Sequence, residues 1–192
     1  MSELRTSVSE TWKRAILSHY RVNFGDTYQS RSWPKGPSQQ IGAEFSVLEF
    51  PPRANDDKWT YATCCMSQPS DVAPLELHLF SSKQDVGNVE LLTMTAHYHR
   101  TGASLGLNHT VNIGRPWVPQ SSCDHCLISL PYLFGPKLEV LNQEGKEIRF
   151  LWLLPITKAE REFKAINGIE ALESRFETQS LNYLNPFRCS VV

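Results

Sequence analysis

The stretch that decides the fold runs from Ile148 to Phe176 and reads IRFLWLLPITKAEREFKAINGIEALESRF. Residues 148–154 are apolar except for Arg149, and so continuous a run predicts a strand that is covered on both faces. Because proline cannot donate to a β-ladder, we expect this strand to end at Pro155. The core of the protein must therefore lie on both sides of the strand.

The residues after Pro155 predict a helix that begins at once and is then interrupted. Thr157 precedes Glu160 by three positions, which is the spacing of a capping box at a helix N-terminus. Asn167 and Gly168 fall inside the helical pattern and indicate a break into two short helices. One apolar stripe runs through both helices in steps of three and four. Its members are Ala159, Phe163, Ile166, Ile169, Leu172 and Phe176.

The rest of the chain predicts an α+β fold. Strand-like runs dominate the middle, and helical patterns lie at about residues 8–22 and, after Ser82 as N-cap, at 83–100. Loops are expected at 25–40 and 115–125. The predicted strands cover residues 45–50, 59–65, 75–80, 107–113, 126–134, 138–142 and 147–154, the last two joined by a hairpin turn at 143–146.

The strand at 75–80 alternates in polarity. Leu75, Leu77 and Leu79 share one face, and Glu76 and His78 share the other. A period of two is typical of a strand with one buried and one solvated face. We therefore expect Glu76 and His78 on a wetter side of the sheet.

Length and charge limit the classes of function. At 192 residues the chain is expected to form one domain over residues 1–192, with an N-terminal helix and loop in 1–39. Its 19 lysines and arginines nearly balance 20 aspartates and glutamates, so no general field draws it to nucleic acid or anionic lipid. We expect neither direct nucleic-acid binding nor membrane binding.

The sequence also indicates a compartment. The N-terminus is polar and lacks the apolar core of a signal peptide, and no apolar run approaches the roughly 20 residues of a membrane span. The five cysteines are an odd number, and two of them are adjacent. Together these features favour a reducing cytoplasm over secretion.

Cysteine spacing suggests a metal or redox site only weakly. Cys123 and Cys126 have the CxxC spacing used by zinc and redox sites, but they precede a predicted strand, not a helix. Cys64 and Cys65 lie within a strand, where adjacent side chains point to opposite faces and cannot share one ion. We expect ordinary cysteines, no cofactor and no bound metal, and keep Cys123 and Cys126 as the alternative.

No catalytic constellation is visible along the chain. Residues 102–106 match the G-x-S-x-G pattern of hydrolases, but they follow a helix and precede a strand, the reverse of the required order. An enzyme would have to use His78, His125 or the cysteines. We expect a protein without catalytic activity.

Several stretches, in order, resemble the suppressor of fused domain over about residues 40–192. They are 59–67 (WTYATCCMS) with 74–79 (PLELHL), 111–117 (VNIGRPW) with 127–134, 150–157 (FLWLLPIT) with Glu160 and Phe163, the segment with Gly168, Glu170 and Leu172, and 185–192 (NPFRCSVV). Cys65 stands where the family's glycine is expected before Met-Ser. This replacement argues against a tight backbone turn there.

The resemblance implies binding instead of catalysis. Animal members of the family bind and restrain a transcription factor through an extended peptide. Bacterial single-domain members look like immunity proteins, which bind and neutralise a toxin, often a nuclease. The resemblance also implies a mixed sheet flanked by helices, and the length of this chain is similar to that of the bacterial kind.

These observations leave three hypotheses open. In the first, an immunity-type domain binds a toxin, with Asp56, Asp57 and Asp71 steering a basic partner and Trp33 and Trp117 serving as contact anchors. In the second, a peptide-binding module captures its partner by strand addition at a sheet edge. In the third, a metal-binding enzyme uses cysteines and histidines.

Overall fold

The computed structural model describes residues 2–34 and 40–192, so the predicted loop at 25–40 lies partly outside the described residues. The helices are α1 (Ser2–Phe24), α2 (Val86–Thr101), α3 (Pro136–Glu139), α4 (Lys158–Asn167) and α5 (Ile169–Thr178). The strands are β1 (Gln29–Arg31), β2 (Ser46–Phe50), β3 (Trp59–Cys64), β4 (Leu75–Ser81), β5 (Thr110–Asn112), β6 (Cys123–Ser129), β7 (Val140–Gln143) and β8 (Lys146–Thr157).

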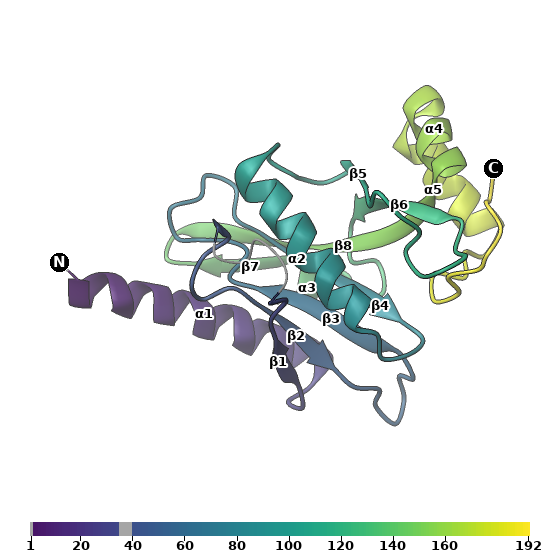
Figure 1. The fold of residues 1–192 in the computed structure, drawn as a ribbon. Helices are drawn as coiled ribbons and strands as arrows, with labels where there is room; N and C mark the ends of the chain where they lie inside the picture. Colours follow the sequence, from purple (N-terminus) through teal and green to yellow (C-terminus); the bar gives the residue numbers. More distant parts are fainter. Residues whose placement is uncertain (1, 35–39) are drawn as a thin grey trace.

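The strands of the described chain form one mixed sheet in the order β1-β2-β3-β4-β8-β6-β5. β4 and β8 are parallel, every other neighbouring pair is antiparallel, and β7 pairs with β8 off the main path. The α+β class, the mixed sheet and its flanking helices are confirmed (Figure 1).

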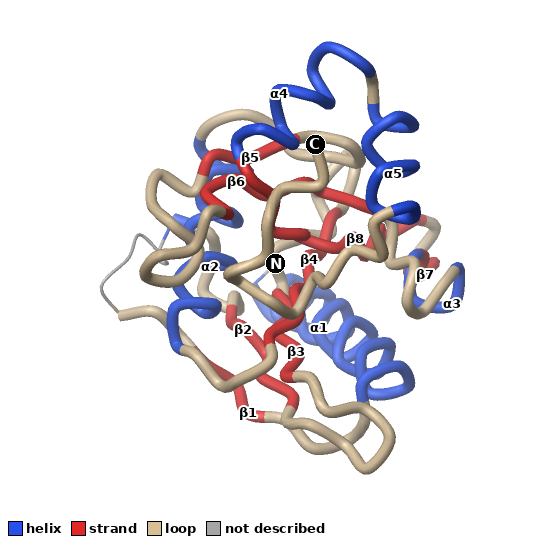
Figure 2. The backbone as a smooth tube through the Cα atoms, turned by 90° about the vertical axis from the view of Figure 1, so that its right-hand side faces the viewer, coloured by secondary structure: helices blue, strands red, loops and turns tan. Residues whose placement is uncertain are grey.

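Helices cover both faces of the sheet. The apolar residues of α2 join a core with Leu77, Leu79 and Leu153, whereas α1 joins a second core with Phe150 and Trp152. Figure 2 shows α1 and α2 on opposite sides of the strands, with α5 on the far side of β8 from α2. None of the described helices is long and apolar enough to span a membrane.

β8 is the strand predicted at the centre of the fold, and both of its faces are buried. All residues from Phe150 to Thr157 are buried, and successive side chains enter the two cores alternately. The prediction that Pro155 ends the strand is wrong. β8 pairs with β4 only up to Trp152, and the carbonyl of Pro155 accepts from the Arg188 guanidinium at 3.2 Å on the side away from β6. The N–H that proline lacks would point the same way, away from β6, so the pairing of β8 with β6 loses no hydrogen bond.

The prediction of a wetter face on β4 is also wrong. All seven residues of β4 are buried, because α1 covers the side that carries Glu76 and His78. The Glu76 carboxylate is satisfied by local donors instead of water. It accepts from Thr63 Oγ1 at 2.5 Å, from Ser67 Oγ at 2.6 Å and from the Ser67 N–H at 2.9 Å.

Several predicted boundaries shift. α1 begins at Ser2 and not at residue 8, and α2 begins at Val86 because Asp85, not Ser82, accepts from the Gly87 N–H at 2.8 Å as N-cap. Val86 is therefore exposed. Of the strands, β1 lies inside the predicted loop at 25–40, because its residues pair with β2. β5 is shorter than predicted, and β6 begins inside the predicted loop at 115–125 and ends before Pro131.

The helices after β8 show the predicted pattern at their ends. Thr157 and Glu160 form the capping box, and Gly168 separates α4 from α5. The apolar stripe is only partly buried: Leu172 is fully buried, but Ala159 and Ile166 are exposed. The fully buried side chain on α4 is Glu160, which pairs with the C-terminal tail, while Phe163 packs partly buried against the second core.

The irregular tail, residues 179–192, is fixed by Arg188. Its guanidinium donates to both carboxylate oxygens of Glu160, at 2.5 and 2.7 Å, and the Val191 N–H adds a third bond to that carboxylate at 3.1 Å. Both charged side chains are almost completely buried. The pair links the tail, the start of α4 and the end of β8.

Replacing Arg188 by methionine is expected to lower the free energy of unfolding by about 3–5 kcal/mol, because it leaves the Glu160 carboxylate buried without a counter-charge. Arg21→Met is the matched control, since the Arg21–Asp26 pair is exposed and such pairs contribute about 0–1 kcal/mol. Urea denaturation of both variants measures the difference. Equal losses would show that Arg188 acts only as a surface residue.

Candidate functional site

An open strand edge is the first feature of the candidate site. β5 lies at one end of the sheet and pairs with β6 alone among the described strands. In the register, Val111 stands opposite Cys126. On its other side, β5 carries main-chain groups that no strand of residues 2–34 or 40–192 adjoins, and such groups are a template for pairing with another chain.

The hydrogen bonds to β6 identify which main-chain groups are free. The Ile113 N–H donates to a main-chain carbonyl of β6, and the His109 carbonyl accepts from a main-chain N–H of β6. Both distances are 2.9 Å. Bonding to one neighbour alternates along an antiparallel strand, so the odd-numbered residues face β6. The N–H and C=O groups of Thr110 and Asn112 therefore point toward the open edge.

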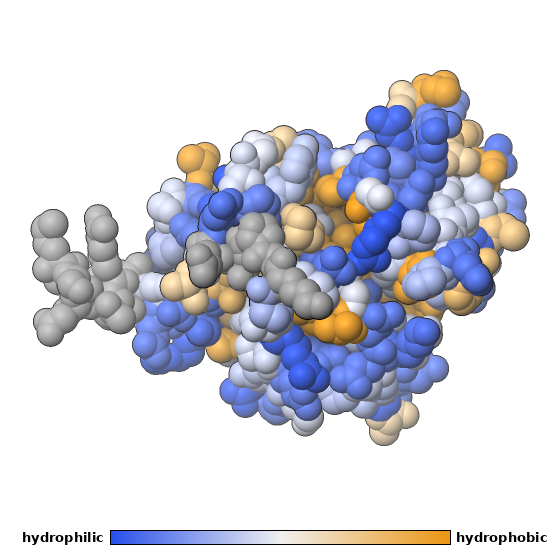
Figure 3. All heavy atoms as spheres, in the orientation of Figure 1, coloured by the Kyte–Doolittle hydropathy of each residue, from blue (hydrophilic) through white to orange (hydrophobic). Residues whose placement is uncertain are grey.

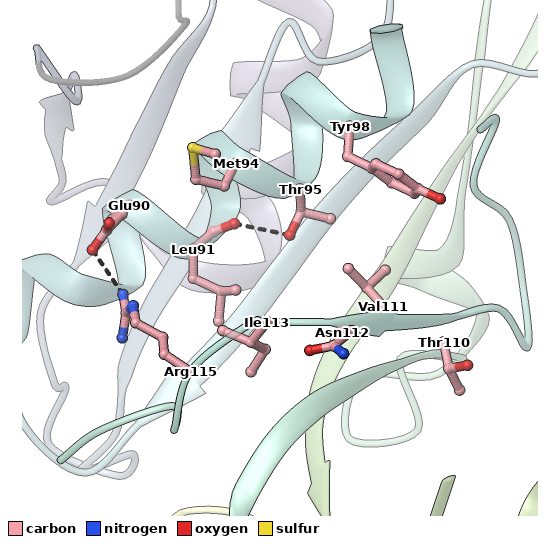
Figure 4. Close-up of a pocket in the computed structure, with 10 residues that line it drawn as sticks. All are labelled: Glu90, Leu91, Met94, Thr95, Tyr98, Thr110, Val111, Asn112, Ile113 and Arg115. Atoms are coloured by element: carbon pink, nitrogen blue, oxygen red, sulfur yellow. Dashed lines mark hydrogen bonds and ion pairs between the residues drawn. The ribbon is translucent and has the colours of Figure 1, made fainter. Parts of the chain in front are cut away.

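A groove of about 430 Å³ lies between this edge and α2 (Figure 4). Met94 and Tyr98 are the two exposed apolar residues that α2 contributes to its lining, at 45% and 46% exposure, and Val111 points toward Tyr98 from β5. Figure 3 shows apolar surface in the hollow between the two elements. The full lining is Glu90, Leu91, Met94, Thr95, Tyr98, Thr110, Val111, Asn112, Ile113 and Arg115.

These groove residues were not predicted from the sequence, although the sequence carries one signal for them. Met94 and Tyr98 are four positions apart and therefore share one face of α2, away from the buried Val89, Leu92 and Ala96. Apolar side chains on the outer face of a helix indicate a surface that another element covers.

An ion pair closes one end of the groove. Arg115 Nη2 donates to Glu90 Oε2 at 2.7 Å, and its Nη1 donates to the carbonyl of Trp117 at 3.3 Å. Trp117 is one of the two residues predicted as contact anchors, and its part in binding stays a prediction. Its side chain is buried and Nε1 donates to Asn88 Oδ1 at 2.9 Å, so Trp117 fixes the loop after β5 to α2.

Trp33, the other predicted anchor, is partly buried and packs against the core on the α2 side of the sheet. It does not line the groove. Its part in binding stays a prediction.

The three predicted acidic contacts do not lie together. Asp56 and Asp57 precede β3, whereas Asp71 comes after it, so they lie at opposite ends of a six-residue strand about 20 Å long. Asp56 accepts from Lys58 Nζ at 2.5 Å, and Asp71 forms a two-oxygen pair with Arg100 at 2.7 Å for each bond. Asp57 is exposed.

The CxxC cysteines are buried inside β6. Cys123 and Cys126 are free thiols, and burial raises the pKa of both. Raised pKa values keep the thiols protonated, which is the form that neither binds metal nor attacks an electrophile. Within residues 2–34 and 40–192, no group of three or more His, Cys, Asp or Glu residues could hold a metal ion.

The adjacent cysteines do not behave as predicted. β3 ends at Cys64, and Cys65 adopts a left-handed conformation with φ of 63°. The tight turn is therefore present, although cysteine in place of the family's glycine argued against it. The prediction that the two side chains point to opposite faces is wrong as well. Their Sγ atoms lie 3.9 Å apart, because the strand pleat stops before Cys65.

His78 and His125, the histidines considered for catalysis, lie in different surroundings. His78 is fully buried beside Phe24 and Phe80, and burial lowers its pKa to about 3. Neither of its ring nitrogens has a hydrogen-bond partner among the residues that the structure describes. His125 is mostly buried, and its Nδ1 lies 2.8 Å from Asp124 Oδ1. Neither reaches the groove.

Comparison with known proteins places the chain in a family. No curated protein matches it. The family model described as Suppressor of fused protein (SUFU) matches residues 42–188. A crystal structure from Neisseria gonorrhoeae FA 1090, described as that of a SUFU homologue, is 33% identical with a TM-score of 0.82, and the match covers 94% of this chain and 97% of that one.

Two more distant structures share the fold at 12% identity. One is the Sufu–Fu complex, with a TM-score of 0.70 over 94% of this chain and 92% of that one. The other is Drosophila Suppressor of Fused, with a TM-score of 0.71, of which the match spans 51%. The family match over most of the sequence and the 33% identity to the gonococcal protein agree with each other: the chain belongs to the suppressor of fused family.

Proposed function

We propose that this chain is a protein-binding domain that captures an extended segment of its partner at the free edge of β5, in the groove beside α2. The observation that carries the proposal is the unpaired main chain of Thr110 and Asn112 next to an apolar groove. Main-chain bonds to an added strand supply affinity, and pockets for alternate side chains supply specificity.

The geometry of the groove supports one orientation of the captured segment. A strand laid along β5 would place every second side chain toward Met94 and Tyr98. The same strand would end near the Glu90–Arg115 pair, where the groove becomes charged. The proposed ligand is therefore a short extended segment with an apolar residue at its centre.

We also propose that the domain acts without catalysis. His78 is buried with no route to a substrate, and its low pKa keeps it neutral at physiological pH. Burial raises the pKa of the Cys123 and Cys126 thiols, which keeps them protonated. These features support binding over an enzymatic role for these residues.

For the partner, we propose a toxin, so that the domain acts as a cytoplasmic immunity protein. This part rests on the resemblance to bacterial single-domain members of the family. Five free cysteines support a reducing compartment. Of the acidic residues proposed for steering, Asp57 is the one that is exposed without an ion pair among the described residues.

Proline at position 110 is expected to block strand addition. Thr110→Pro removes an N–H that points away from β6, so the sheet keeps its ladder while the added strand loses a bond and meets the ring. We expect roughly tenfold weaker binding of a peptide selected on the wild-type domain from a random-peptide display library. Fluorescence polarisation measures the affinity.

The matched control is Thr110→Val, which keeps the N–H and the strand preference of the residue. Amide hydrogen exchange gives an independent readout, since the Thr110 amide should exchange quickly in the free domain and become protected when the peptide is bound. Equal affinity for the two variants, or no change in exchange at position 110, would contradict strand addition at β5.

A charge inside the groove is expected to weaken the same peptide. Met94→Glu places a carboxylate where the captured apolar side chain packs, and we expect a loss of about 1–3 kcal/mol in binding free energy. Val72→Glu is the control, because Val72 is fully exposed and lies outside the groove. Isothermal titration calorimetry on both variants measures the binding free energy of the peptide. Equal losses would show that the peptide binds outside the groove.

Co-expression tests the toxin partner separately. Growth should be restored when the chain is expressed with a toxin encoded beside its gene, and Asp57→Lys should slow association several-fold at low salt. Stopped-flow kinetics with the purified toxin measure that rate. If the folded chain binds its selected peptide but restores no growth, the toxin assignment fails and peptide capture stands.

A further inference from the structure

Cys64 and Cys65 form a contact that the proposed binding function does not use. Their Sγ atoms are 3.9 Å apart at the end of β3, and both thiols are free. Cys64 is fully buried, while Cys65 keeps 7% exposure. Two adjacent residues of a regular strand could not make this contact, because their side chains would point to opposite faces.

The contact depends on the backbone of Cys65. Its φ of 63° is a left-handed conformation that residues other than glycine rarely adopt. A glycine would be less strained at this position, but it would carry no thiol. The strained cysteine therefore brings a second sulfur to Cys64 at a conformational cost.

We propose that Cys64 and Cys65 are a redox pair that closes reversibly to a disulfide between adjacent residues when the protein meets a hydroperoxide. The Cys65 sulfur, the more exposed of the two, takes the outer peroxide oxygen and becomes a sulfenic acid, and the alcohol (water, for hydrogen peroxide) leaves. The Cys64 sulfur then attacks the sulfenic sulfur and water leaves. Two thiol hydrogens and two electrons pass to the peroxide in total.

The surroundings favour a cross-link over a bound ligand. A disulfide needs no added volume, whereas an ion would have to fit between two sulfurs on the α1 side of the core, of which only that of Cys65 belongs to a residue with any exposure. No group of three His, Cys, Asp or Glu residues surrounds a possible ion in the part of the chain that the structure describes. Two sulfurs alone do not complete the four-ligand shell of a zinc site.

The proposed disulfide would be labile. Neighbouring Cα atoms are about 3.8 Å apart, below the roughly 4.4–6.8 Å that disulfides usually span. A cross-link there distorts the turn and is easily reduced, which suits a switch more than a permanent staple. The buried, hydrogen-bonded Cys64 thiol has a raised pKa, so closure is expected to be slow and to need sustained oxidant.

The turn connects this pair to α1. Directly after it, the Met66 and Ser67 N–H groups donate to Glu76, at 3.3 and 2.9 Å, and Ser67 Oγ accepts from Trp12 Nε1 at 3.1 Å. Pulling Cys65 toward Cys64 displaces these donors. Oxidation should therefore loosen the contact between α1 and the sheet without touching the β5 groove.

Intact-protein mass spectrometry after treatment with hydrogen peroxide tests the proposal. We expect the loss of two hydrogens, located by peptide mapping to residues 64 and 65 and reversed by dithiothreitol. Cys64→Ser and Cys65→Gly should abolish the loss, and the glycine variant keeps the left-handed turn so that folding is retained. A Cys123→Ser, Cys126→Ser double variant should still lose two hydrogens.

Amide exchange is the second readout. In the oxidised protein the amides of α1 should exchange faster, while those of β6 and β8 stay unchanged. Three outcomes would each overturn the proposal. They are sulfinic acid at Cys65 without a cross-link, a disulfide elsewhere, and a folded protein that does not react although the urea-unfolded protein does. Peptide binding at β5 is not part of the test, so its failure would leave this result intact.

Discussion

The parallel pairing of β4 with β8 is the constraint on which the rest of the structure depends. Two parallel neighbours cannot be joined by a tight turn, so residues 82–145 must form a long crossover between β4 and β8. That crossover carries α2 onto one face and also supplies β5, β6 and β7. β8 becomes a strand with neighbours on both sides and a core on both faces. This accounts for the apolar run at 148–154, which a solvated strand would not need.

The same crossover produces the open edge. β6 takes the place beside β8, and β5 is then the last strand, with α2 in front of it and no strand beyond among the described residues. An edge with free main-chain groups invites unwanted pairing unless it is short or covered. β5 has three residues, and α2 lies beside it, so the edge is short and the groove runs along it. A short edge of this kind limits unwanted pairing.

Features set by near neighbours in the chain could be predicted from the sequence, whereas features set by distant contacts could not. The Thr157–Glu160 capping box and the break at Gly168 are of the first kind. The prediction for Pro155 is wrong because β4 pairs with β8 only up to Trp152, and on that side Arg188, 33 residues away, binds the Pro155 carbonyl in place of a strand. The candidate site is also of the second kind, since an edge is a property of strand order and nothing in β5 itself indicates that β6 is its sole described partner. The apolar outer face of α2 gave a local signal, but it became interpretable only when β5 was placed beside it.

The two faces of the sheet therefore differ in how they respond when an interaction is lost or gained. On the α1 side, buried polar groups depend on one another: Glu76 holds the turn after Cys65, and Ser67 joins that turn to Trp12. Removing one partner leaves another unsatisfied, so this layer responds as a unit. On the α2 side, the apolar part of the groove and the outward main chain of β5 can gain a partner without breaking an internal bond. A binding surface fits the second face, and a switch fits the first.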